Sequence, residues 1–395
     1  MDEQPLAGVT VLDFGQIYNG PYCGFLLAMA GARVVKVESR EGESLRDRAR
    51  GSSATYAFAM LNANKQGITL NLKSERGREL LKSLATRVDV LVENFSPGTM
   101  ERHGVGSAAL CEVNPRLVYA AGTGFGRTGP HRDYVAMDIT VQAMTGIMSI
   151  TGDGDAPLKA GPALCDFLGG VHLYGAIVTA LYQRQRTGKG AVIDVSMQDA
   201  TFPTLATALG AMHYLGHPPA RVGNRHQALT LAPYNVYRAK DGWVAIICIR
   251  EGHWRSLVAA MGNPAIAGDP RLKDMVSRAR HMELVDSTVE AWTSQLTKEE
   301  VFRIAQAHDI VCAPVKDLPE VMEDPHLRAR GMLSPATHPL LGDTMLPSTP
   351  LRFEGLVPPA LGAAPGLGEH NRVVYADLLG LSGDEIDALE RAGAI

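Results

Sequence analysis

The sequence predicts an α/β protein with a large domain built on a parallel sheet and a second, smaller domain. Short apolar segments alternate with helical segments through the first 200 residues, and this alternation is typical of a parallel sheet with helices on both faces. The chain has 395 residues, enough for two domains. Proline and glycine become frequent after Leu215, in the segment GHPPARVGNRHQALTLAPYN, which is typical of a linker.

The strands of the large domain follow one another with helices between them. The segment GVTVLDF (8–14) predicts a buried strand, YCGFLLAMAGA (22–32) a helix, and RVVKVES (33–39) the next strand. The alternation continues with a helix over 74–87, strands over 88–95 and 116–125, a helix over 166–186, a strand over 191–197 and a helix over 198–215.

The second domain begins differently, with an antiparallel pattern. The segment VYRAKDGWVAIICI (236–249) predicts a hairpin with its turn at Asp241-Gly242, and helical segments follow to about Ala313. The loop-rich segment 323–350 leads the chain back to the large domain. The resulting division is 1–200 for the large domain, 201–225 for a linker, 226–329 for the small domain, and 330–395 to complete the large domain.

In the tail, Ser382 and Glu385 have the spacing of a capping box, which predicts a last helix.

Composition excludes several classes of function. Hydrophobic residues make up 46% of the chain and the net charge is −4, so nothing indicates a nucleic-acid partner. We expect no transmembrane segment, because no apolar run of sufficient length is evident. We also expect no signal peptide, because the first residues do not show a basic region followed by an apolar stretch. Five scattered cysteines favour the reducing cytoplasm over a disulfide framework or a zinc site. We therefore expect a cytoplasmic protein without metal or membrane.

Two acids stand in unusually apolar surroundings. Asp166 lies at the head of GPALCDFLGGVHLYGAIVTAL, followed by the pair Gly169-Gly170. As a helix N-cap, Asp166 would contribute roughly 1 kcal/mol to the stability of the helix. As a functional acid, it would lie beside two glycines that allow another group to approach the helix closely. Asp138 lies in YVAMDITVQAMTG, either as a buried, hydrogen-bonded acid or as the second member of a tuned pair.

Familiar catalytic motifs are weak or absent. GFGRTG (124–129) has the glycine spacing of a dinucleotide site, but Pro130 and polar residues follow instead of the required helix. Glu38, at the end of the second strand, imitates the acid that binds an NAD ribose, without the accompanying glycines. No serine-hydrolase, zinc-protease or P-loop string occurs, and His172 fits a structural role.

Longer blocks resemble a known family. In order and spacing, the chain is similar to the class III CoA-transferases of the CaiB/BaiF type, which include formyl-CoA transferase and carnitine CoA-transferase. The blocks that carry the resemblance are PLAGVTVLDFGQIYNGPYCGFLLAMAGARVVKVE, NANKQGITLNLKSERGRELLKSLATRVDVLVENFSPGTMERHGVG, NPRLVYAAGTGFGRTGP, DFLGGVHLYGAIVTALYQRQRTGKGAVIDVSMQDA and PGLGEHNRVVYADLLGLSGDEIDALERAGAI.

The resemblance implies a mechanism in which Asp166 is the nucleophile. Its carboxylate would attack an acyl-CoA thioester to form an anhydride, and CoA would then form an aspartyl thioester that the acceptor acid attacks. Acyl-CoA donors and carboxylic acid acceptors are the implied partners, with no permanently bound cofactor. Backbone N–H groups near Gly169-Gly170 are candidates to meet the developing oxyanion, and Asp138 matches an active-site acid of the family.

The resemblance also implies CoA contacts and an assembly. Lys73 and Arg102 would pair with CoA phosphates, while Ser39 stands where several relatives have a basic residue. The implied fold is a Rossmann-like large domain, an inserted small domain, and a homodimer of two ring-shaped, interlocked subunits. The CoA contacts carried over are Ile17, Tyr18, Leu70, Lys73, Asn94, Phe95 and Arg102.

Two alternatives stay open at this point. An α-methylacyl-CoA racemase would need a histidine immediately before the Asp138-type acid, where this chain has Met137. A non-catalytic CoA-binding protein would use Asp166 only as a cap. The substrates are open as well, and Arg225, His226 or Arg250 are candidates to hold a distal carboxylate of the acceptor.

Overall fold

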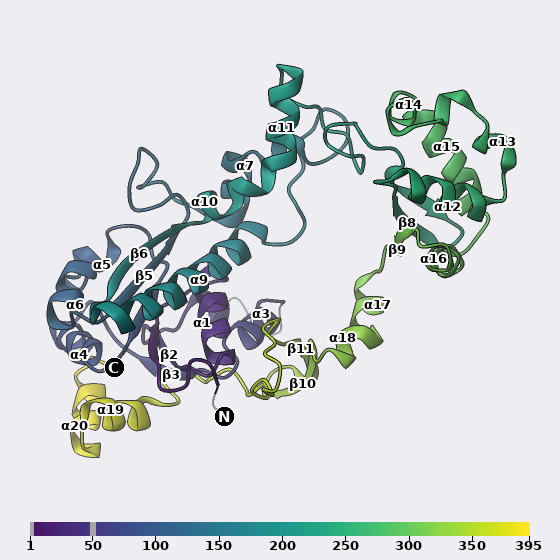
Figure 1. Cartoon of the computed structure of the whole chain (residues 1–395). Helices are drawn as coiled ribbons and strands as arrows, with labels where there is room; N and C mark the ends of the chain where they lie inside the picture. The colour runs from purple at the N-terminus through teal and green to yellow at the C-terminus, as the bar shows by residue number, and fades with distance from the viewer. Residues whose placement is uncertain (1–3, 48–52) are drawn as a thin grey trace. The chain divides into compact units, whose positions relative to one another are not determined.

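The computed structural model describes residues 4–47 and 53–395. Contacts divide the chain into two compact units (Figure 1), each of which is described by itself. The larger unit comprises Met1–Thr145, Gly161–Pro203 and Asp324–Ile395, and the smaller comprises Gly146–Ala160 and Thr204–Glu323. The domain bounds expected from sequence stay predictions.

A six-stranded parallel sheet forms the centre of the larger unit, in the order β3-β2-β1-β4-β5-β6. This is the doubly wound order, in which the direction of strand addition reverses between β1 and β4. Ligands of such folds bind outside the carboxyl ends of the strands at this reversal. The strands are β1 (Thr10–Asp13), β2 (Arg33–Glu38), β3 (Gln66–Thr69), β4 (Val90–Glu93), β5 (Val118–Thr123) and β6 (Ala191–Ser196).

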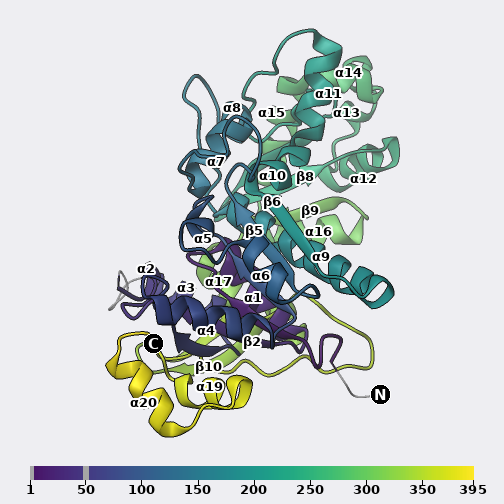
Figure 2. The ribbon, with the colours of Figure 1, turned by 90° about the vertical axis from the view of Figure 1, so that its left-hand side faces the viewer.

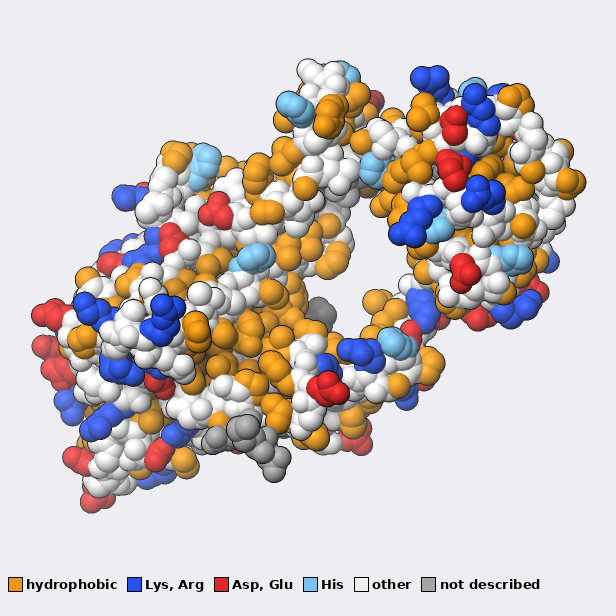
Figure 3. Space-filling model, in the orientation of Figure 1, with side chains coloured by type: hydrophobic (Ala, Val, Ile, Leu, Met, Phe, Trp, Pro, Cys, Tyr) orange, Lys and Arg blue, Asp and Glu red, His pale blue; other side chains and the backbone are white. Residues whose placement is uncertain are grey.

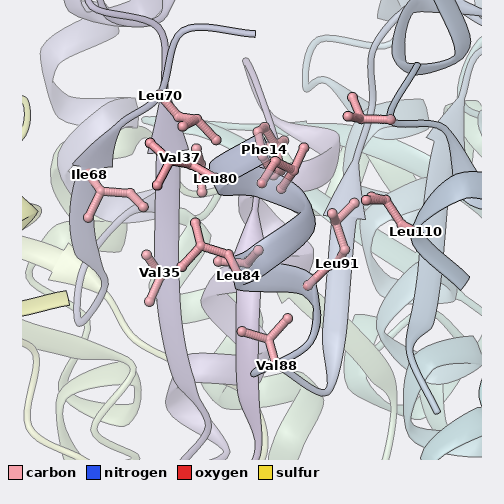
Figure 4. Close-up of a cluster of buried hydrophobic side chains, with 14 of the residues drawn as sticks. Phe14, Val35, Val37, Ile68, Leu70, Leu80, Leu84, Val88, Leu91 and Leu110 are labelled. Carbon is pink, nitrogen blue, oxygen red and sulfur yellow. The ribbon is translucent and has the colours of Figure 1, made fainter. Parts of the chain in front are cut away.

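Helices cover both faces because alternate strand residues point to opposite sides. On one face, Leu80 and Leu84 of α4 (Glu75–Ala85) pack on Val35 and Leu91 (Figure 4). On the other face, α1 (Asn19–Met29) and α9 (Leu164–Thr187) cover the neighbouring strand residues. Ile177 of α9 is fully buried there. The sheet therefore lies between two apolar layers.

The C-terminal segment returns to this unit. Helix α19 (Asn371–Leu379) packs against β3, α4 and α20 (Gly383–Arg391). Both C-terminal helices lie beside α4 in the two ribbon views (Figures 1 and 2). Tyr375 of α19 is buried and donates a hydrogen bond to the Thr69 carbonyl. The capping box expected at Ser382 and Glu385 is present.

The smaller unit has an antiparallel sheet of three strands in the order β7-β8-β9. Tyr237, Val244 and Val289 belong to its buried core. Its main elements are β7 (Tyr234–Ala239), β8 (Gly242–Ile247), β9 (Val311–Pro314), α12 (Glu251–Met261), α15 (Met282–Thr293) and α16 (Lys298–Ala307).

Four local expectations differ from the structure. The hairpin turn lies one residue earlier than expected, because Ala239 pairs with Gly242. Strand β9 ends a region expected to be helical, and edge strand β3 was not predicted from the short segment QGIT. Residues 323–350, expected to be loop-rich, contain helix α18 (Pro325–Ala329) and an antiparallel hairpin of β10 (Leu333–His338) and β11 (Gly342–Pro347). These elements are short and contain proline or glycine, so their apolar pattern is weak.

Helix α9 also corrects the expectation that no apolar run reaches transmembrane length. By length and composition alone it could cross a membrane, whereas here it packs against β5, β6 and α1. Its buried side chains, among them Leu173 and Ile177, belong to the core of the larger unit. The apolar character of α9 is therefore explained by its place beside the sheet.

Buried charges hold the turn between β1 and α1. The Asp13 carboxylate and the Lys65 amine are fully buried and 2.7 Å apart. Asp13 also accepts the Gly15 N–H at 2.7 Å, while Lys65 donates to the Pro21 carbonyl at 2.9 Å. The pair thus ties the end of β1 to the first turn of α1.

A second set of side chains fixes the middle of the same turn. Lys36 donates to the Gly15 carbonyl at 2.8 Å, and Glu43 accepts the Ile17 N–H at 3.1 Å. The Asn94 carboxamide bonds both backbone groups of Gln16, at 2.7 and 2.9 Å. Ile17 has a φ of 63°, which is unfavourable for a β-branched residue, so these bonds stabilise a conformation that the residue would not adopt alone.

We expect Lys65→Met to destabilise the protein strongly. Removal of one member of a buried pair leaves the Asp13 charge uncompensated and costs about 3–5 kcal/mol. The matched control is Arg76→Ala, which breaks an exposed pair with Glu79 and should cost only about 0.2–0.5 kcal/mol. Urea unfolding measures both. A loss below about 1 kcal/mol in Lys65→Met would contradict the role given to this pair.

Candidate active site

Two adjoining cavities lie at the carboxyl ends of the strands, beside the reversal between β1 and β4. The Asp166 cavity has a volume of about 300 Å³ and the Lys73 cavity about 280 Å³. Both are lined by Gln16, Phe95 and Thr99. The two cavities therefore offer adjacent binding space for one elongated ligand.

Asp166 is held in the first turn of α9 but does not cap it. The helix begins at Leu164, its N-cap residue is Ala163, and no side chain of that residue caps it. Asp166 is the third helical residue and is only 9% exposed. The N-cap interpretation of Asp166 is therefore wrong.

Asp138 performs the capping instead. It is the first residue of α7 (Asp138–Thr145), and its Oδ1 accepts the backbone N–H groups of Cys165 at 2.8 Å and Asp166 at 3.3 Å. Its Oδ2 accepts a hydrogen bond from Gln142 at 2.6 Å. Among the residues that the structure describes, none donates a hydrogen bond to the Asp166 carboxylate. Asp138 thus accepts hydrogen bonds from the backbone N–H groups at the start of α9, while the Asp166 carboxylate faces the cavity without a hydrogen-bond donor among the described residues.

This environment raises the pKa of Asp166 to about 7. Burial is the main cause, because a charged carboxylate loses hydration there, and the nearby Asp138 charge adds repulsion. At neutral pH the Asp166 carboxyl is therefore divided between its acid and its carboxylate form. A poorly solvated, unpaired carboxylate is the state in which this group is most nucleophilic.

The glycine pair of α9 makes room for Asn19 at the start of α1. A Cβ on Gly169 would lie 2.2 Å from Asn19 Nδ2, and one on Gly122 of β5 would lie 2.4 Å from Asn19 Oδ1. Asn19 Nδ2 donates to the Asp166 carbonyl at 3.4 Å. The N–H groups of Gly169 and Gly170 lie beyond the first helical turn and are used within α9. The expected oxyanion contact at these glycines is therefore not supported.

Five of the seven expected CoA contacts line the two cavities. Ile17 and Asn94 line the Asp166 cavity. Leu70 and Lys73 line the Lys73 cavity, and Phe95 lines both cavities. The Asn94 carboxamide forms two hydrogen bonds with the Gln16 backbone. Asn94 therefore stabilises the cavity wall at Gln16.

Tyr18 and Arg102 line neither cavity. The Tyr18 ring packs near Phe167, with centroids 5.9 Å apart. Arg102 donates to the Thr99 hydroxyl at 2.8 Å, and Thr99 belongs to both cavities. Arg102 is therefore one residue removed from the binding space.

Sequence reasoning did not single out Gln16 and Asn19. Both line the Asp166 cavity, and the only signal for Asn19 was the glycine pair that has to accommodate a neighbour. Glu38, the imitation of an NAD-binding acid, bonds the Arg46 guanidinium at 2.7 and 2.8 Å. In the described part of the chain, no cluster of three or more His, Cys, Asp or Glu residues is arranged to hold a metal.

Comparisons with known proteins agree on one family. Residues 6–371 match CoA-transferase family III. The chain is 36% identical to the formyl-CoA:oxalate CoA-transferase of Streptomyces coelicolor, with 100% of both chains covered. It is 33% identical to the succinyl-CoA–D-citramalate CoA-transferase of Chloroflexus aurantiacus, covering 98% of this chain and 97% of the relative.

A solved structure supports the same assignment. A CaiB/BaiF family protein from Brucella suis is 31% identical and superposes with a TM-score of 0.84, covering 95% of this chain and 100% of that one. The chain therefore belongs to CoA-transferase family III.

Proposed function

We propose that the protein moves CoA between carboxylic acids, with Asp166 carrying first the acyl group and then CoA. The observation that carries this proposal is the buried carboxylate of Asp166, which has no hydrogen-bond donor among the described residues and opens into a cavity adjoining the one lined by Lys73. The relatives named as CoA-transferases act on oxalate, citramalate and other acids, and they support the reaction class.

The proposed cycle needs no ATP because each intermediate conserves the thioester energy. The Asp166 carboxylate attacks the acyl-CoA carbonyl and the C–S bond breaks. CoA thiolate departs, and a mixed anhydride of Asp166 and the acyl group remains. The thiolate then attacks the aspartyl carbonyl and releases the donor acid. The acceptor carboxylate attacks this aspartyl thioester, the C–S bond breaks, and CoA thiolate is expelled as a second anhydride forms. The thiolate then attacks the acyl carbonyl of this anhydride, which gives the new acyl-CoA and releases the Asp166 carboxylate.

The racemase alternative lacks a second base. Met137 stands where that chemistry would need a histidine, and a thioether does not take a proton at neutral pH. Both oxygens of Asp138 accept hydrogen bonds, from the α9 backbone and from Gln142. The surroundings of Asp166 therefore favour one nucleophile over a pair of bases on opposite sides of a substrate.

We also propose that the protein works as an interlocked homodimer in the cytoplasm, as its family resemblance implies. Val171 and Tyr182 of α9 are 43% and 64% exposed on the isolated chain. Figure 3 displays hydrophobic side chains gathered over the face that carries α9. Such a surface is suited to burial against another subunit. All five cysteines are free thiols, which suits a reducing compartment.

Replacement of the nucleophile should abolish transfer. We expect Asp166→Ala to lose at least ~10³-fold in kcat, the scale seen when a covalent nucleophile is removed. Incubation with acyl-CoA followed by hydroxylamine should convert Asp166 to a hydroxamate, which peptide mass spectrometry detects. The control is Glu112→Gln, which alters an exposed acid of α6 (Ser107–Val113). Full turnover in Asp166→Ala would reject the mechanism.

The rate should follow the ionisation of Asp166. Because the carboxylate is the nucleophile, kcat/KM should rise with pH and level off above about 7, where the Asp166 pKa lies. Asp138→Asn keeps an oxygen to cap α9 and removes the repelling charge, so this rise should move to lower pH. Asp138→Ala should instead lose the cap, at a cost of about 1 kcal/mol. An unmoved pH profile in Asp138→Asn would contradict the coupling of the two acids.

Lys73 should contribute to CoA affinity. We expect Lys73→Ala, and likewise Arg102→Ala, to weaken CoA binding by about 1–3 kcal/mol through loss of a charge-assisted contact with phosphate. Lys82→Ala is the control, since Lys82 is exposed on α4 and lines neither cavity, whereas Arg102 at least bonds Thr99, which lines both. Titration calorimetry measures the affinities. Unchanged affinity in both Lys73→Ala and Arg102→Ala would locate CoA elsewhere.

A further inference from the structure

The turn between β4 and α5 (Thr99–Arg102) is a wall that the two cavities share. Phe95 and Thr99 line both cavities, and the residues around Phe95 line the Asp166 cavity. A shift of this turn would therefore change both cavities at once. The lining residues that the turn supplies are Asn94, Phe95, Ser96, Pro97 and Thr99.

Glu93, the last residue of β4, is bonded to this turn through its side chain. Its Oε2 accepts the Phe95 backbone N–H at 2.8 Å, and its Oε1 accepts the Tyr119 hydroxyl at 3.2 Å. Glu93 is 7% exposed and Tyr119 is fully buried. Glu93 lines neither cavity, so it acts on a bound ligand through Phe95.

The side chains of the turn are engaged with the segment that follows β1. The Phe95 ring lies beside that of Phe14, with centroids 6.3 Å apart, and the Asn94 carboxamide bonds the Gln16 backbone. The Phe95 main chain between them is held by Glu93. Because backbone N–H groups need an acceptor, loss of this bond would displace the main chain of the wall.

Glu93 points to the face of the sheet that α4 covers, since it lies on the same side of β4 as Leu91. Helix α4 presents apolar residues to this face. The charged and titratable groups around Glu93 come from β5, α5, α6 and the loop after β5. They are Tyr119, Glu101, Arg102, Cys111 and Arg127.

These surroundings bring the ionisation of Glu93 into the neutral range. Burial raises its pKa to about 7, although the hydrogen bonds from Phe95 and Tyr119 and the charge of Arg127 favour the carboxylate. Arg127 itself pairs with Glu101 at 2.7 Å. A neutral carboxyl accepts a hydrogen bond less strongly than a carboxylate does. Protonation of Glu93 therefore weakens the bond that holds the Phe95 main chain.

We propose that Glu93 is a positioning residue for CoA, whose carboxylate holds the Phe95 turn in the conformation that shapes both cavities, so that CoA binds more weakly when Glu93 is neutral. This inference rests on the proposed CoA-transferase function. It depends on bonds within one unit of one chain, between residues that the structure describes.

Glu93→Gln tests the role of the charge, because glutamine has nearly the same shape and is neutral at every pH. At pH 8.5 its Kd for CoA, measured by titration calorimetry, should be about fivefold higher than that of wild type, the difference between a charge-assisted and a neutral hydrogen bond. At pH 5.5 the two Kd values should agree, since Glu93 is then protonated in wild type. Ionisation of CoA and of Asp166 affects both proteins alike.

Turnover separates positioning from chemistry. Glu93→Gln should raise the KM for acyl-CoA about fivefold and leave kcat within about twofold, because Asp166 is untouched. Glu112→Gln, an exposed acid of α6, is the matched control and should keep the wild-type Kd at both pH values. Equal Kd values for wild type and Glu93→Gln at pH 8.5 would overturn the inference. Absence of CoA binding by wild type would instead reject the proposed function.

Tyr119→Phe tests the same carboxyl group without removing it. The Tyr119 hydroxyl favours the ionised form of Glu93, so its loss should move the fall in CoA affinity to higher pH. The Phe95 bond remains in this variant, and its limiting Kd at alkaline pH should match wild type. A lower limiting affinity with an unmoved pH profile would show that the cluster acts only through stability, and would overturn the positioning role of the Glu93 charge.

Discussion

The buried pair of Asp13 and Lys65 is the interaction on which the site depends. It fixes the end of β1 to the start of α1, with both charges fully buried. Asn19 is the first residue of α1 and reaches the Asp166 carbonyl. A displacement of the turn would therefore displace Asn19 from its place between Gly122 and Gly169, and with it the contact to the first turn of α9. Buried charge is a costly way to hold a loop, but it leaves little freedom in the wall of the binding space.

The two acids at α9 divide two tasks that one residue could not perform together. Asp138 satisfies the backbone N–H groups of the helix end, so the Asp166 carboxylate is not consumed by capping. The arrangement has a thermodynamic cost. The pKa of Asp166 is raised from 3.8 to about 7 on folding. As pH rises between these values, the unfolded chain ionises first and the fold loses stability; above about 7 the loss is complete and constant. An unpaired carboxylate is thus kept in the cavity at the expense of stability.

Sequence patterns predicted the parts of the fold that depend on local periodicity. The apolar strands, the helices between them and the capping box at Ser382 follow from spacing alone, and they are present. The family resemblance directed attention to Asp166. The edge strand β3 and the hairpin of β10 and β11 escaped prediction because a few residues with glycine or proline carry too little pattern.

The remaining features of the site could not be predicted because they are formed by residues far apart in the chain. Lys65 meets Asp13 across 52 positions, and Asn94 meets Gln16 across 78. The capping of α9 by Asp138 likewise spans 27 positions. Periodicity within a short segment contains no information on such pairs. The paired glycines of α9 indicated that something approaches closely, without indicating that it is Asn19.

The most direct test of the account follows an oxygen atom. In the proposed cycle the acceptor carboxylate gives one oxygen to Asp166 when the second anhydride is cleaved at the acyl carbonyl. A single turnover with an acceptor labelled with ¹⁸O at both oxygens, followed by peptide mass spectrometry, should therefore find one ¹⁸O in the Asp166 side chain. In later turnovers the label should appear in the released donor acid. An Asp166 peptide without label, after a turnover that has produced the new acyl-CoA, would contradict covalent catalysis by this residue.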